Sequence, residues 1–196
     1  MPMSVAAAVR HKISRIPRGQ PFVLDRVVGT DSRSAVSKAL AALVQKGTLR
    51  RVLPGVFVRP EFSRLLGEAP ANLETVVRVV ARARGETLQL HGSEAARHFR
   101  LSTQMQVVAT YYTNGPTRTF QAGLAKVRLI HARPEVLQHA GTQVGAAVSV
   151  LYYLTDGETS EAVLRTITSR LDSTELDRLR SCKLPKWVTA ILRKDE

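Results

Sequence analysis

TDSRSAVSKALAALVQKGTLRRVLPGVFVRP, residues 30–60, contains one amphipathic segment followed by two short apolar segments. The apolar residues of the first segment recur at the spacing of one helix face: Val36, Ala39, Leu40, Leu43 and Val44. We expect Thr30 or Asp31 to cap this helix at its start and Gly47 to end it. The first half of the stretch therefore predicts a helix that is apolar on one side only.

The second half of the stretch predicts a β-hairpin. Residues 49–53 and 56–59 are rich in β-branched and aliphatic side chains, and Pro54-Gly55 between them is the residue pair of a type II turn. Successive side chains of a strand point to opposite faces, so Arg50 and Arg51 cannot both face the core. At least one of these two arginines is expected to point into solvent.

The segments that precede residue 30 complete a recognisable order of elements. Ser4 is a predicted cap for a helix over residues 5–16, residues 22–24 predict a strand that pairs with the hairpin, and residues 24–28 predict a short helix that ends at Gly29. Three helices followed by a hairpin are typical of a winged helix-turn-helix, which lays its third helix in the major groove of DNA. We therefore predict an N-terminal winged helix-turn-helix domain over residues 1–64.

The polar face of the third predicted helix is the candidate DNA-reading surface, because recognition helices contact bases from their N-terminal half. The alternative is an ordinary solvated helix face. Basic residues of the hairpin and of the flanking segments would contact phosphates. The full set of DNA-binding candidates is Arg33, Ser34, Ser37, Lys38, Arg50, Arg51, Lys12, Arg15, Arg18 and Arg59.

Charge supports an anionic partner. The net charge is +13, and residues 1–64 carry 12 basic and 3 acidic side chains, whereas residues 65–196 carry 17 and 13. A positive charge concentrated in the winged-helix region favours nucleic acid as the partner. The single cysteine, Cys182, excludes an intramolecular disulfide and fits a cytoplasmic protein. We find neither a signal peptide nor a membrane-spanning run, and we expect no membrane partner.

Residues 65–196 predict a second, mixed α/β domain with a small antiparallel sheet and a helical tail, so the fold class of the chain is α+β. Residues 60–70 are a linker candidate. Asn72 is a predicted cap for a helix over 73–84, and Ser93 for one over 94–100. Strands are expected at 88–90, 105–112, 118–120 and 126–130, with Asn114-Gly115 as a hairpin signal. Four helices are expected at 144–154, 160–169, 173–180 and 185–193.

Patterns of catalytic chemistry are weak throughout the chain. The histidines form no HExxH pair, Ser93 lies in HGSEA rather than in a GxSxG turn, and no glycine-rich phosphate loop occurs. Cys182 has lysines nearby but no neighbouring histidine, so we expect it to be a packing residue. We predict no catalytic residue, no metal and no cofactor, and hence a protein that is not an enzyme.

Two segments carry a resemblance to a known family. SRSAVSKALAALVQKGTLRRVLPGVFVRP resembles the N-terminal winged-helix domain of AbiEi-type antitoxins of type IV toxin–antitoxin systems, known from abortive infection. HGSEAARHFRLSTQ, the strands after it and the tail with LPKWVTAIL are similar to the rest of those proteins. One departure is Pro54, where we expect family members to carry a basic residue before the glycine.

The resemblance implies a DNA-binding transcriptional autorepressor that binds inverted repeats in its own promoter, an arrangement compatible with a homodimer on DNA. It also implies an antitoxin that counters a nucleotidyltransferase-like toxin, by contact with the toxin or through the toxin's substrate. Two other hypotheses stay open. One is a winged-helix regulator with a ligand-sensing or dimerising C-terminal domain. The other is a nucleic-acid-processing enzyme, which requires two or three clustered carboxylates in the second domain.

Overall fold

The chain is an α+β protein that divides into two compact units. The computed structural model describes residues 4–29, 31–63, 67–154 and 161–192. The first unit comprises residues 1–85 with 121–125, and the second comprises residues 86–120 with 126–196. Sequence placed the boundary at residues 64–65, whereas the units divide at residues 85–86. Residues 65–85 group with the first unit because their helix packs beside its sheet.

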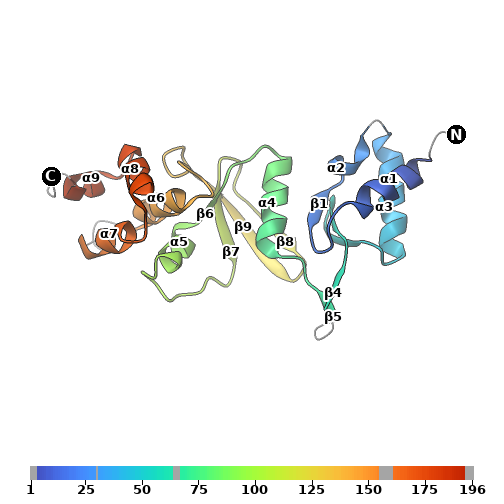
Figure 1. Cartoon of the computed structure of the whole chain (residues 1–196), viewed down its shortest axis with the longest axis horizontal. Coiled ribbons are helices and arrows are strands. Elements are labelled where there is room, and N and C mark those ends of the chain that lie inside the picture. Colours follow the sequence, from blue (N-terminus) through green and yellow to red (C-terminus); the bar gives the residue numbers. More distant parts are fainter. Residues whose placement is uncertain (1–3, 30, 64–66, 155–160, 193–196) are drawn as a thin grey trace. The chain divides into compact units, whose positions relative to one another are not determined.

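The first unit begins with three helices and a three-stranded antiparallel sheet (Figure 1). The elements in chain order are α1 (Val5–Ser14), β1 (Pro21–Val23), α2 (Asp25–Val28), α3 (Arg33–Gln45), β2 (Arg50–Leu53) and β3 (Val56–Val58). The strands lie in the order β1-β3-β2, so the strand at residues 21–23 pairs with the hairpin as the sequence predicted. Gly55, at φ +79°, supplies the left-handed position that the tight turn between β2 and β3 requires.

Apolar side chains from all three helices and the sheet form the core of this region. It contains Val9, Ile13, Ile16, Phe22, Leu24, Val27, Val36, Leu40, Leu43, Leu49 and Phe57. The predicted apolar face of the third helix supplies Val36, Leu40 and Leu43, and helical spacing likewise puts Val9 and Ile13 of α1 on one face. The packing therefore fixes which side of α3 faces solvent.

Helix α3 begins later than the sequence suggested. Asp31 does not cap it, and Thr30 lies outside the described residues; Ser32 is the cap, in an extended conformation, and its Oγ accepts from the Ala35 amide at 3.2 Å. A serine directly before the helix reaches the third amide better than a residue one position further back. Arg33 is consequently the first residue of the helix.

Residues 60–70, expected to be a linker, contain a β-hairpin instead. Strands β4 (Glu61–Ser63) and β5 (Gly67–Ala69) pair antiparallel. Pro60, Pro70 and the mixed charge between them suggested a linker. Two paired strands, however, need no hydrophobic run to form their backbone hydrogen bonds. Helix α4 (Leu73–Ala83) follows, with the Asn72 cap that the sequence predicted, and packs its apolar side beside β1.

The four-stranded sheet is mixed rather than antiparallel. Its strands are β6 (Leu88–Leu90), β7 (Ala109–Thr113), β8 (Arg118–Ala122) and β9 (Ala125–His131), in the order β6-β7-β9-β8. Strand β7 pairs antiparallel with β6 but parallel with β9. Asn114-Gly115 therefore does not turn the chain between neighbouring strands, because β9 lies between β7 and β8. The expected strand over 105–112 begins only at Ala109.

Helix α6 (Gln143–Tyr153), of which residues 144–151 are all buried, belongs to the apolar core of the second unit and packs against α5 and α8. The others are α5 (Gly92–His98), α7 (Glu161–Thr168), α8 (Ser173–Ser181) and α9 (Lys186–Leu192). The predicted helical tail is confirmed in all four of its segments. The predicted Ser93 cap is wrong: His91 caps α5, and its Nδ1 accepts from the Ser93 amide at 3.3 Å.

Candidate nucleic-acid interface

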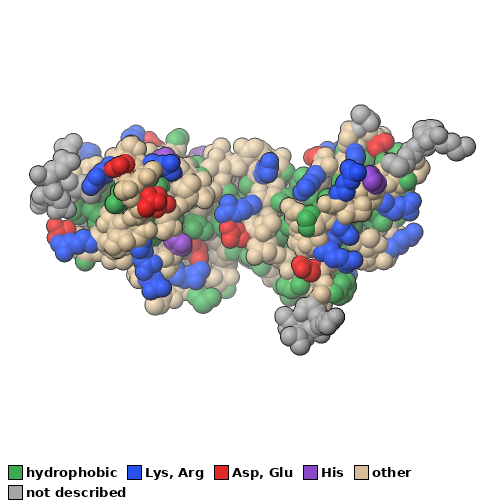
Figure 2. All heavy atoms as spheres, viewed as in Figure 1, with side chains coloured by type: hydrophobic (Ala, Val, Ile, Leu, Met, Phe, Trp, Pro, Cys, Tyr) green, Lys and Arg blue, Asp and Glu red, His purple; other side chains and the backbone are tan. Residues whose placement is uncertain are grey.

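One face of α3 consists of exposed polar side chains. Arg33, Ser34, Ser37 and Lys38 are all exposed, whereas Val36, Leu40 and Leu43 on the other side are buried. The side chains of Ser34, Ser37 and Lys38 have no hydrogen-bond or ion-pair partner among the described residues. We call these four exposed residues, together with Arg50 and Arg51 of β2, the α3–β2 surface. Figure 2 shows Lys and Arg side chains over the part of the molecule that α1 and α3 form.

Arg33 is held by a carboxylate of the neighbouring helix. Its Nη1 donates to Oδ1 of Asp25, the first residue of α2, and both side chains are more than half exposed. A carboxylate suits the start of a helix, where the dipole is positive, whereas an arginine there is unfavourably placed. The ion pair offsets that disadvantage and orients the guanidinium at the N-terminal end of α3.

The two arginines of β2 differ in their partners. Arg50 donates through Nε and Nη2 to both carboxylate oxygens of Glu68 on β5, at 2.7–3.1 Å. These hydrogen bonds lower the pKa of Glu68 and raise the pKa of Arg50. Arg51 is exposed and has no such partner in the described chain. Both arginines are exposed although they are consecutive in β2, an edge strand of the sheet, and the bulge lies after them, between Arg51 and Leu53.

Three other predicted DNA-binding residues bind the protein's own backbone. Lys12 Nζ donates to the Val27 carbonyl at 3.1 Å, Arg18 Nη1 to the Pro60 carbonyl at 3.2 Å, and Arg59 Nη1 to the carbonyls of Ser14 and Ile16 at 2.9 and 2.6 Å. Val27 and Ser14 lie in the last turns of α2 and α1, where carbonyls lack partners within the helix. We call Lys12, Arg18 and Arg59 the α1 junction.

Arg15, the last of the predicted residues, is exposed, and no described residue pairs with it. Sequence reasoning missed the two carboxylates, Asp25 and Glu68, that hold arginines of the α3–β2 surface. Asp25 lies eight residues before Arg33, and Glu68 lies in the supposed linker, so no local spacing marked either pair. It also left out three exposed cations of residues 4–59: Arg10, Arg26 and Lys46.

Ser93 and Cys182, the two candidate nucleophiles of the sequence, lie in the second unit. Cys182 is buried, and burial raises the pKa of its thiol, as expected of a packing cysteine. Among the described residues, no three His, Cys, Asp or Glu side chains gather closely enough to hold a metal ion. None of the helices described is both long and apolar enough to span a membrane.

Comparison with known proteins gives one match. Neither the curated proteins nor the solved structures contain a match for this chain. A protein-family model matches residues 8–179, which include both the α3–β2 surface and most of the second unit. The chain therefore belongs to DUF6088, a family of unknown function.

Proposed function

We propose that the first unit is a winged helix-turn-helix that binds double-stranded DNA. Its order of elements, α1-β1-α2-α3-β2-β3, and its strand order, β1-β3-β2, support this assignment. In this proposal α3 enters the major groove and the β2–β3 hairpin contacts the backbone beside it. The excess of 12 basic over 3 acidic side chains in residues 1–64 attracts the phosphates.

The observation that carries the proposal is the exposed face of α3. On an ordinary solvated helix face, opposite charges three or four positions apart can stabilise the helix by pairing. Here Ser34, Ser37 and Lys38 have no partner among the described residues, and they lie in the first half of the helix. Short hydroxyl side chains beside basic ones permit close approach to base edges, which a helix of long paired side chains would prevent.

Individual roles follow from the contacts. Arg33 can pair bidentately with a guanine, and Asp25 holds it in one orientation. Lys38 and Arg51 are available for phosphates, since neither has a partner within the described chain. Arg50 reaches a phosphate only by leaving Glu68. The α1 junction would add positive field but few direct contacts, because its donors are engaged by carbonyls.

The biological role that we propose is that of a cytoplasmic autorepressor and antitoxin. The resemblance of residues 32–60 and 91–104 to AbiEi-type antitoxins supports it. The chain would bind inverted repeats in its own promoter, where a homodimer fits the symmetry. The second unit would counter a nucleotidyltransferase-like toxin, directly or through the toxin's substrate.

A titration of the promoter fragment by fluorescence anisotropy tests the DNA-binding part. Lys38→Ala should weaken binding clearly more than Lys46→Ala, which removes an exposed lysine from the other end of α3 and serves as the control. Arg33→Ala should cost about 1–3 kcal/mol and relax specificity at one base pair. Equal effects of the two lysine variants together with unchanged binding by the Arg33 variant would refute the winged-helix interface.

Co-expression with the adjacent gene tests the antitoxin part. A neighbouring open reading frame that encodes a nucleotidyltransferase-like protein should arrest growth alone and be tolerated together with this chain. If DNA binding is observed but no such gene lies nearby, the winged-helix regulator with a ligand-sensing or dimerising second unit is the better description. The two experiments separate DNA binding from toxin neutralisation, so each part can fail by itself.

A further inference from the structure

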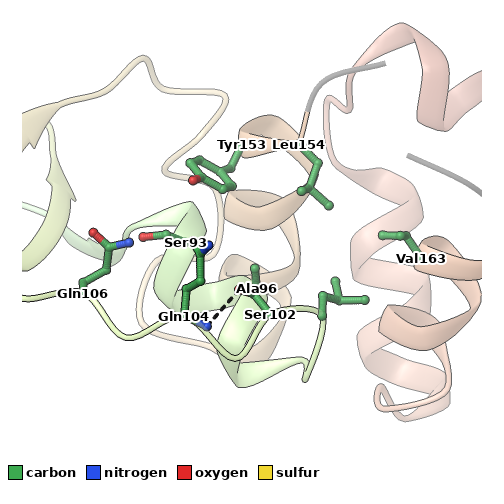
Figure 3. Close-up of a pocket in the computed structure, with 9 residues that line it drawn as sticks. Ser93, Ala96, Ser102, Gln104, Gln106, Tyr153, Leu154 and Val163 are labelled. Carbon is green, nitrogen blue, oxygen red and sulfur yellow. Dashed lines mark hydrogen bonds between the residues drawn. The ribbon is translucent and has the colours of Figure 1, made fainter. Parts of the chain in front are cut away.

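A cavity of about 300 Å³ opens among the helices of the second unit, away from the α3–β2 residues in sequence (Figure 3). Its walls come from α5, the loop over residues 101–106, the end of α6 and the start of α7. The volume lies at the lower end of the range of small-molecule sites. Its polar lining consists of Ser93, Ser102, Gln104, Gln106 and Tyr153, and the rest is aliphatic.

The aromatic wall of the cavity is held in place by its neighbours. A Cβ on Gly92 would lie 2.0 Å from the Tyr153 Cβ, so only glycine lets α6 approach the start of α5 this closely. The Tyr153 ring then meets the His91 ring edge-on at 5.4 Å between centroids. Tyr153 is still 43% exposed, which leaves part of its ring accessible to a ligand.

Ser93 offers the cavity a hydrogen-bond acceptor of fixed direction. Its Oγ lies 2.8 Å from His91 Nδ1, which also accepts the Ser93 amide. The amide can only donate, so Nδ1 has a lone pair rather than a proton, and burial favours this neutral ring by lowering the pKa of His91. The Ser93 hydroxyl must therefore donate to His91, and the lone pairs of its oxygen remain for a ligand N–H or O–H.

The other polar groups of the lining are uncharged. Gln104 and Gln106 are exposed amides, each with both donor and acceptor atoms, and Figure 3 shows Gln106 on the same side as Ser93 and Tyr153, with Val163 on the opposite side. The described lining contains no Lys, Arg, Asp or Glu side chain. This described lining offers no cation to neutralise a phosphate or a carboxylate, and it favours a neutral ligand.

We propose that this cavity binds the base of an uncharged nucleoside. A glutamine amide matches the paired donor and acceptor edge of a base, and a tyrosine ring stacks on its face. The Ser93 oxygen would accept from an exocyclic amino group, and the aliphatic wall would cover the other face. This inference is independent of DNA binding by the first unit.

Isothermal titration of the full chain with adenosine, guanosine, cytidine and uridine tests the proposal. At least one nucleoside should bind saturably with one site per chain. Gln104→Ala should weaken that nucleoside about 3- to 10-fold, the effect of one lost hydrogen bond. Val163→Phe, which fills the cavity from the far wall, should abolish binding. Gln121→Ala removes an exposed glutamine outside the lining and should change nothing.

Three outcomes would overturn the proposal. The first is the absence of binding by all four nucleosides up to their solubility limits. The second is binding that both Gln104→Ala and Val163→Phe leave intact. The third is a 5′-monophosphate that binds more than about tenfold tighter than its nucleoside, since a neutral lining cannot supply that gain. Circular dichroism establishes whether each variant is folded. If Val163→Phe is not folded, Gln104→Ala still tests the proposal, because Gln104 is exposed and its loss leaves the core intact.

Discussion

The α3–β2 surface and the α1 junction are both rich in basic residues, yet they use them differently. In the α1 junction, Lys12, Arg18 and Arg59 donate to main-chain carbonyls and so connect separate segments of the first unit. On the α3–β2 surface, Lys38 and Arg51 have no partner in the described chain. The comparison teaches that net charge indicates a class of partner, whereas the hydrogen-bond partners of each cation indicate where that partner binds.

The largest effect on stability should come from the α1 junction. Arg59→Met should lower the free energy of unfolding by about 2 kcal/mol, because two carbonyls at the end of α1 lose a charged donor. Arg51→Met, the matched change on the α3–β2 surface, should cost less than about 0.5 kcal/mol. Urea unfolding followed by circular dichroism measures both. Equal losses would mean that the two regions do not differ in their structural role.

DNA binding should show the reverse order. Arg51→Met should weaken binding to every duplex and lower the salt slope of log K by about one, as the loss of one phosphate contact does. Arg18→Met should leave the slope nearly unchanged, because Nη1 of Arg18 is engaged by the Pro60 carbonyl. Anisotropy titrations over a range of salt give both slopes. A larger change with Arg18 would place the phosphate contacts at the α1 junction instead.

The difference between the two regions was only partly predictable from sequence. The exposed face of α3 followed from the spacing of Val36, Leu40 and Leu43, since a helix with one apolar face has only one way to bury it. The partners of Lys12, Arg18 and Arg59 were not predictable, because they are main-chain carbonyls 15 to 45 residues away. Every residue has a carbonyl, so no sequence pattern identifies the one that a given arginine will meet.

Strand pairing in the four-stranded sheet was unpredictable for a related reason. The segments were found, but Asn114-Gly115 suggested a hairpin, and the sheet instead places β9 beside β7. Pairing depends on which strands share a core, and Val127 and Leu129 of β9 are both fully buried. In the same way, β4 and β5 pair through backbone hydrogen bonds, and the residue types of 61–69 do not indicate that pairing.

Asp25→Asn tests whether the orientation of Arg33 matters for sequence reading. The loss of an exposed ion pair should cost less than about 1 kcal/mol in stability. The variant should bind all duplexes a few-fold more tightly, because one negative charge is gone. It should discriminate less between matched and mismatched operators, because Asp25 no longer orients Arg33. Competition between the two duplexes measures this ratio. Unchanged discrimination would show that Arg33 reads DNA without help from Asp25.

Glu68→Gln should have the smallest effect on stability, and the effect should depend on pH. Hydrogen bonds from Arg50 lower the pKa of Glu68 in the folded chain below its unfolded value. The contribution of the pair is therefore present above the unfolded pKa and is lost as pH falls through the folded pKa. Urea midpoints of the wild type and the variant should differ at about pH 7 and converge at about pH 3.

Glu68→Gln in an Arg50→Met background is the control. Without the arginine, it should shift the urea midpoint at neither pH. If Glu68→Gln destabilises the chain equally at both pH values, the cause is lost packing in the β4–β5 hairpin and not the ion pair. Where the pair does account for the effect, Glu68→Gln should also strengthen DNA binding by releasing Arg50. Arg50 would then behave like Arg51, and Glu68 would be the residue that keeps one of the two β2 arginines from the phosphates.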